Sequence, residues 1–147
     1  MVEILCRKSY NFFMEEFIVI ENKKYLVNYD RPAVCKALDG LDIVKPTSRP
    51  IVERAIIYYA CLPKKLKTVF NALAVELNLM PSTVATHIRN AIITAEFNGG
   101  LKNIDDLFGA EIYDYDYGLS SKNFLAIMSS HLKNSGLIIV KNGDKRE

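Results

Sequence analysis

The pattern of apolar and polar positions is strand-like in the N-terminal third of the chain and helical in the rest. Two short runs of β-branched and aromatic residues, 17–20 and 24–27, flank the polar residues 21–23, and this arrangement predicts a β-hairpin. Asp30, with a proline two residues later, is typical of a helix start, so a short helix should follow and end near Gly40. Because an isolated hairpin is only marginally stable in water, this part has to pack on another surface.

The remainder of the chain has helical periodicity, with apolar stripes that each predict an amphipathic helix. The predicted helices cover residues 50–62, 64–78, 81–97, 103–108 and 121–133. An apolar run at 137–140 predicts a short terminal strand. Residues 112–117 alternate aromatic and acidic side chains, which leaves a short strand and a tyrosine-lined loop as alternatives.

These elements predict a mainly α fold: a helix-turn-helix-containing helical domain with a small N-terminal β-hairpin plus helix. The stretch 45–50 contains two prolines and marks the boundary between the two parts. We therefore expect a hairpin and helix element at 1–47, a helical domain at 48–136, and a C-terminal strand and tail at 137–147.

The composition is that of an ordinary globular domain, with 50% hydrophobic and 24% charged residues among 147. No apolar run is long enough to span a bilayer, and the first residues lack the apolar core of a secretory signal, so we expect a cytoplasmic protein without a membrane partner. Cys6, Cys35 and Cys61 are widely spaced, which favours buried thiols over disulfides or a zinc site. The motifs of nucleotide, hydrolase and metalloprotease sites are absent, so we expect no enzyme, no cofactor and no metal.

Charge is segregated along the chain. Residues 48–92 contain six basic and two acidic residues, whereas residues 93–118 contain one basic and six acidic residues. The basic stretch favours an anionic partner, and an ordinary solvated face is the alternative.

The predicted helices 64–78 and 81–97, joined by a short break, are a candidate helix-turn-helix. In that motif the second helix buries one face and presents the other to the DNA major groove. Its residues away from the apolar stripe carry the hydroxyl, amide and guanidinium groups that can read base edges. These candidate base-reading residues are Ser82, Thr83, Thr86, Arg89 and Asn90. Lys64, Lys65 and Lys67, at the start of the first helix, are candidates for phosphate contacts. His87 lies beside the apolar stripe and is expected to be packed.

Several short motifs along this region form a wider pattern. They are Leu77-Asn78, Ser82-x-Val84, Ile88-Arg89-x-Ala91-Ile92, Gly99, Ile104-Asp105, Leu107-Phe108-Gly109 and Ser121-x-Asn123-Phe124-x-Ala126-Ile127-Met128. Over residues 49–134 the chain resembles the DNA-binding effector domain of the sporulation master response regulator of spore-forming Firmicutes. The resemblance implies an all-helical helix-turn-helix domain that binds short boxes of double-stranded promoter DNA, commonly as a dimer through its last helix.

The last predicted helix has apolar residues on more than one side, which also favours a second copy or another partner. Burial against the N-terminal hairpin is the competing explanation. The candidate interface residues are Phe124, Ile127, Met128 and His131.

The chain departs from the family pattern in the second helix. The family has Glu-Arg-Ala-Ile-Arg where this chain has Ala85-Thr86-His87-Ile88-Arg89, so only Arg89 carries over as a base-reading arginine. The replacement of the other arginine by Thr86 implies weaker base discrimination. Residues 1–47 are too short for the family's receiver domain, so control by phosphorylation does not carry over.

Two hypotheses follow. The first is a sequence-specific DNA-binding transcription regulator, favoured by the basic stretch and Arg89. The second is a protein-interaction module that pairs with a full-length regulator or with itself without reading DNA, favoured by the lost arginine and the acidic stretch. In either case the N-terminal hairpin is a candidate surface for a protein partner.

Overall fold

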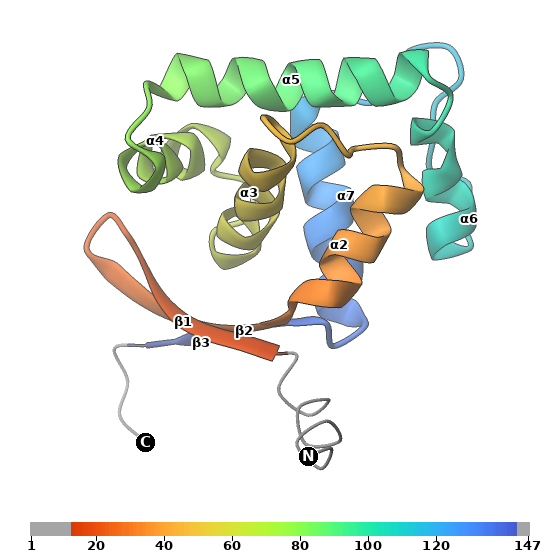
Figure 1. Cartoon of the computed structure of the whole chain (residues 1–147). Coiled ribbons are helices and arrows are strands. Elements are labelled where there is room, and N and C mark those ends of the chain that lie inside the picture. Colours follow the sequence, from red (N-terminus) through yellow and green to blue (C-terminus); the bar gives the residue numbers. More distant parts are fainter. Residues whose placement is uncertain (1–12, 144–147) are drawn as a thin grey trace, which may run out of the picture.

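The structure is a computed structural model that describes residues 13–143 (Figure 1). The predicted hairpin is confirmed, and its strands β1 (Phe13–Ile20) and β2 (Lys23–Asp30) are longer than the apolar runs alone indicated. Glu21 and Asn22 form the turn with φ of 49° and 66°. Two successive residues with positive φ are the geometry of a type I′ turn, whose twist matches that of the flanking strands.

A third strand completes the sheet. β3 (Ile138–Asn142) confirms the predicted terminal strand and pairs antiparallel with β2, which gives the order β1-β2-β3. Alternate residues of the sheet, such as Ile18, Val27 and Ile138, are buried against the helices, as the period of two along a strand requires. Residues 112–117 are a loop with no strand, so the first of the two alternatives for this segment was wrong.

The helices confirm a mainly α fold and begin and end within about two residues of the predicted positions. They are α2 (Arg31–Gly40), α3 (Arg49–Cys61), α4 (Leu66–Leu77), α5 (Pro81–Phe97), the 3-10 turn η1 (Leu101–Asn103), α6 (Ile104–Phe108) and α7 (Ser121–Asn134). Local signals set several ends. Asp30 accepts a hydrogen bond from the backbone N–H of Ala33 at 3.1 Å, and Ser120 accepts one from Asn123 at 3.1 Å.

Helix α3 is the centre of the molecule. Ten of its thirteen residues are buried, because α4, α5 and α7 pack around it and the helix also contacts α2 and the strands β2 and β3. The expectation of an amphipathic helix was therefore wrong for this segment: its apolar run faces all directions, as is typical of a helix enclosed by others. In Figure 1 the sheet lies across one end of the molecule and α5 across the opposite end, with α2, α3 and α7 between them.

One continuous core joins the parts that the sequence suggested as separate. It runs from Ile18 and Val27 in the sheet through Leu38 in α2 and Ile56 in α3 to Ile88 in α5. The hairpin thus packs on the helices, as its marginal stability in isolation requires.

Candidate functional site

Helices α4 and α5 are joined by only three residues. Asn78 adopts the left-handed conformation, with φ of 58°, and ends α4, while Pro81 opens α5 without leaving an unpaired backbone N–H. Five residues of α5 form its buried stripe: Val84, Ile88, Ala91, Ile92 and Ala95. This stripe packs on α3 and α4, so the opposite face of α5 is directed to solvent.

Four of the five candidate base-reading residues lie on this outer face of α5. Ser82, Thr86, Arg89 and Asn90 are exposed, whereas Thr83 is half-buried at the side of the helix. The same face continues toward the C-terminus with Ile93 and Phe97, which are 54% and 90% exposed. Phe97 was missed by sequence reasoning, although its spacing of four residues from Ile93 was a usable signal.

The three candidate phosphate-binding lysines are exposed at the other end of α4. Lys64, Lys65 and Lys67 lie at its N-terminal end, while α5 begins after its C-terminal end. With twelve residues, α4 is about 18 Å long, so these lysines lie at the end of it that is remote from the start of α5. Lys64 also lines a groove beside α7, so its surroundings differ from those of the α5 face.

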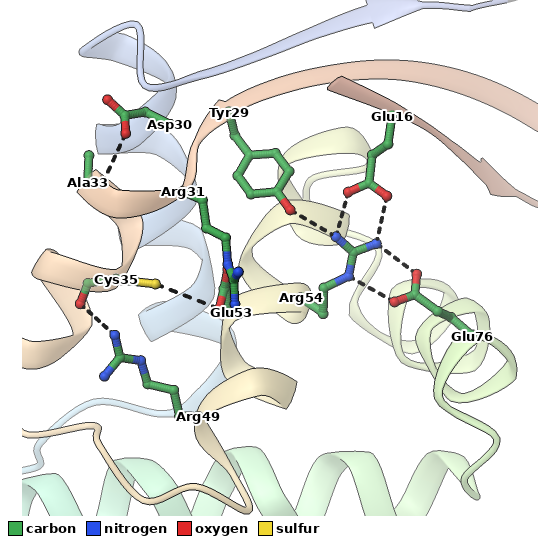
Figure 2. A network of polar contacts seen from close by, with 10 residues as sticks. All are labelled: Glu16, Tyr29, Asp30, Arg31, Ala33, Cys35, Arg49, Glu53, Arg54 and Glu76. Atoms are coloured by element: carbon green, nitrogen blue, oxygen red, sulfur yellow. Dashed lines mark hydrogen bonds and ion pairs between the residues drawn. The ribbon is translucent and has the colours of Figure 1, made fainter. Parts of the chain in front are cut away.

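Two arginines of the basic stretch are engaged inside the protein. Arg54 in α3 lies between Glu16 of β1 and Glu76 of α4, and both carboxylates accept two hydrogen bonds from it (Figure 2). The shortest distances are 2.6 Å from Nη1 to Glu16 and 2.8 Å from Nε to Glu76. Arg49 pairs with Asp39 and donates to the backbone carbonyl of Cys35. Neither arginine therefore contributes a free positive charge to the surface.

The Arg54 cluster is defined here as Arg54, Glu16, Glu76, Tyr29 and Tyr58. Burial alone would lower the pKa of Arg54, but hydrogen bonds and charge from the two glutamates raise that pKa well above its usual range. Burial would raise the pKa of Glu76, yet the hydrogen bonds donated by Arg54 and by the Tyr58 hydroxyl lower it. Because the cluster joins β1, α3 and α4, it fixes the sheet to the helices.

Among residues 13–143, no ion pair joins Arg89 or the three candidate lysines to a carboxylate. These side chains are exposed, and they are the basic groups of the 48–92 stretch that remain available to an anionic partner.

The two sides of α5 differ in charge. On one side the loop 110–119 lies over its C-terminal half, where the Tyr113 hydroxyl donates to Glu96. Asp105 holds this loop by accepting hydrogen bonds from the backbone N–H groups of Ile112 and Tyr113, both at 2.7 Å. The other side of α5 faces the loop 42–48, which contributes Lys45, Asp42 and two hydroxyl residues. The first side carries the acidic residues of the loop 110–119 and Glu96, whereas on the second side the charge of Lys45 offsets that of Asp42, so an anion is repelled more strongly on the first side.

The candidate interface residues of α7 do not share one surface. Phe124 and Met128 have no exposed area, because α7 packs them into the core of its own chain, so the expectation that they form an intermolecular contact was wrong. Ile127 and His131 are half-buried beside a groove of about 500 Å³. The His131 ring stacks on Phe108, with ring centroids 4.2 Å apart.

The described cysteines are Cys35, which is half-buried, and Cys61, which is buried; Cys6 lies outside the described residues. Burial raises the pKa of the Cys61 thiol to about 12, so it is protonated at neutral pH. Within residues 13–143, no group of histidine, cysteine and carboxylate side chains is arranged to hold a metal ion. In the same part of the chain, no helix combines the length and apolar character needed to cross a membrane.

Comparisons of the chain with protein-family models, curated proteins and solved structures find no match. The resemblance to the sporulation regulator effector domain therefore stays a prediction, carried by the motifs of the sequence.

Proposed function

We propose that the protein is a transcription regulator that binds double-stranded DNA, with α4, the three-residue turn and α5 acting as a helix-turn-helix. The observation that carries this proposal is the outer face of α5, where Ser82, Thr86, Arg89 and Asn90 are exposed opposite the buried stripe. Their hydroxyl, guanidinium and amide groups have the hydrogen-bonding capacity to read base edges.

The shape of α5 supports the same function. It has seventeen residues and lies across one end of the molecule, where Figure 1 shows no other helix or strand over its outer side and only a loop reaching its C-terminal end. A helix about 25 Å long with a free outer side fits the major groove, which is wide enough to admit one α-helix. Arg89, midway along this helix, is the residue best placed to contact a guanine.

The test compares a base contact with a phosphate contact. The DNA is a duplex selected for binding from a random pool. Arg89→Ala should weaken binding to this duplex by about 1–3 kcal/mol and should reduce the preference for one base at a single position. Lys67→Gln should instead weaken binding to all duplexes alike and should lower the salt slope, which is the slope of the logarithm of the binding constant against the logarithm of the salt concentration, by about one unit. Fluorescence anisotropy at several salt concentrations measures both effects.

The matched control is Lys141→Gln, because Lys141 lies on β3 at the end of the molecule opposite α5. This variant should bind duplexes like the wild type. If the wild-type protein binds no duplex even at low salt, DNA binding is excluded and the second candidate function takes its place.

The second candidate function is a protein-interaction module, and exposed apolar side chains on α5 favour it. Phe97 and Ile93 are 90% and 54% exposed on the same outer face, and an exposed aromatic residue is a common anchor of protein interfaces. If α5 docks on a second copy of the chain, Phe97→Ser should abolish self-association, which sedimentation measures. If α5 binds DNA through its N-terminal half, Phe97→Ser should leave duplex affinity nearly unchanged.

A further inference from the structure

We infer that the pocket between α5 and the loop 42–48, whose last residue directly precedes α3, binds a phosphate group. The pocket has a volume of about 140 Å³. Polar residues from the loop and from α5 line it: Lys45, Thr47, Ser48, His87, Asn90 and Thr94. Its size suits a single phosphate group and is too small for a nucleoside.

The Ser48 side chain is the first observation that points to a ligand. Ser48 is only 5% exposed, and its hydroxyl has no hydrogen-bond partner among residues 13–143. It precedes the first residue of α3, where a serine commonly caps the helix, but its backbone is helical (φ −101°, ψ −27°) and it makes no capping bond. A buried hydroxyl without a partner is costly, and a ligand oxygen in the pocket would satisfy it.

Lys45 is the second observation. It is exposed at the same pocket and supplies a full positive charge that favours an anion. The N-terminus of α3, next to Ser48, adds the partial positive charge of the helix dipole. Its first backbone groups do not serve as donors, because the N–H groups of Ser48 and Arg49 donate to the carbonyl of Lys45 and Pro50 has none.

Asp42 is the acidic residue of the pocket lining, and its side chain packs against Gly100. A Cβ atom at Gly100 would lie 2.1 Å from Oδ2 of Asp42, so only glycine leaves room for this carboxylate. The charge of Asp42 opposes an anion, which makes this residue a sensitive test of the sign of the bound ligand.

The position of the pocket indicates where the phosphate comes from. Asn90 belongs both to the outer face of α5 and to the pocket lining, so a duplex docked on that face would pass the mouth of the pocket. The phosphate would then be a backbone phosphodiester, and this assignment of its source rests on the proposed function. A free phosphate group is the other source of the same chemistry.

The first arm of the experiment titrates the protein with inorganic phosphate at constant ionic strength and follows the backbone amides by NMR. Amide signals of residues 45–52 and 87–94 should shift in the wild type. These shifts should weaken in Lys45→Gln and Ser48→Ala and strengthen in Asp42→Asn, which keeps a residue type that tolerates the left-handed backbone of Asp42 (φ 63°). Lys141→Gln on β3 should behave like the wild type.

The second arm measures duplex binding by the same variants. If the source is DNA, Lys45→Gln should reduce the salt slope by about one unit for every sequence. Ser48→Ala removes a neutral group, so it should lower affinity about two- to tenfold without changing the slope.

The two arms separate the possible failures. If phosphate shifts the amide signals but Lys45→Gln and Ser48→Ala bind duplexes like the wild type, the pocket is supported and its ligand is free phosphate. If phosphate shifts the amide signals and the wild type binds no duplex, only the proposed function is refuted. If phosphate produces no shifts at the pocket and Asp42→Asn creates none, the phosphate site is refuted, whatever the protein does with DNA.

Discussion

Arg54 and Arg89 belong to the same basic stretch of the chain, but the structure places them in opposite kinds of surroundings. Arg54 is 18% exposed at the junction of the sheet, α3 and α4, and its guanidinium is enclosed by two carboxylates and two tyrosines. Arg89 is exposed on the outer face of α5, away from every ion pair among residues 13–143. The difference shows that a sum of charges along a sequence does not identify which charges a partner can reach.

The largest effect expected from this comparison is on stability. Arg54→Ala leaves Glu16 and Glu76 close together without their common partner and should lower the free energy of unfolding by about 2–3 kcal/mol. This loss is smaller than for a fully buried ion pair, because both glutamates are one-third exposed. Arg89→Ala, the matched change on the surface, should alter the free energy of unfolding by less than about 0.5 kcal/mol. Urea denaturation measures both, and equal losses would contradict the comparison.

A single hydroxyl of the Arg54 cluster gives the next effect. Tyr58→Phe removes the hydrogen bond to Glu76 and should cost about 1–2 kcal/mol of unfolding free energy, since the acceptor is charged. Tyr115→Phe is the control, because Tyr115 is 72% exposed and should tolerate loss of its hydroxyl. A Tyr58 variant as stable as the Tyr115 variant would mean that the Glu76 hydrogen bond contributes little.

The pH dependence of stability sharpens the same point. The pKa of Glu76 in the folded protein lies below its ordinary value of 4.5, so folding favours the ionised form. Its stabilisation should be complete above pH 4.5 and should be lost as the pH falls through the lower pKa of the folded state. Glu76→Gln should therefore be less stable than the wild type at neutral pH, and the difference should shrink on acidification. Thermal unfolding across this pH range checks the sign, and a difference that grows on acidification would contradict it.

The smallest effect is expected on the outer face of α5. Phe97 is 90% exposed, so Phe97→Ser removes almost no buried apolar area and should change the free energy of unfolding by less than about 0.5 kcal/mol. Phe124→Ala in the buried core should cost about 3–5 kcal/mol and serves as the contrast. A large loss with Phe97→Ser would show that the α5 face is covered in solution.

Local patterns in the sequence predicted the elements well because their causes are local. The two-residue turn at Glu21, the cap at Asp30 and the proline at the start of α5 act on neighbouring backbone groups. The exposure of the predicted base-reading residues likewise follows from the position of the buried stripe of α5 around one helix.

The features that the sequence did not reveal depend on residues far apart in the chain. Arg54 meets Glu16 and Glu76 across 38 and 22 positions, and no periodicity encodes that pairing. The burial of Phe124 depends on how α7 packs against the rest of the chain, so its apolar surface looked available from the sequence alone. The unpaired hydroxyl of Ser48 became visible only once the loop 42–48 was placed beside α5.

The pairing of β3 with β2 has a consequence for the synthesis of the chain. Every helix that the structure describes in residues 13–143 lies between these two strands in the sequence. The hairpin and the helices are built from contacts local in the sequence, but the sheet stays incomplete until residue 142 has left the ribosomal exit tunnel. A ribosome stalled within α7 would therefore hold a nascent chain whose β2 edge is open to pairing with strands of other chains.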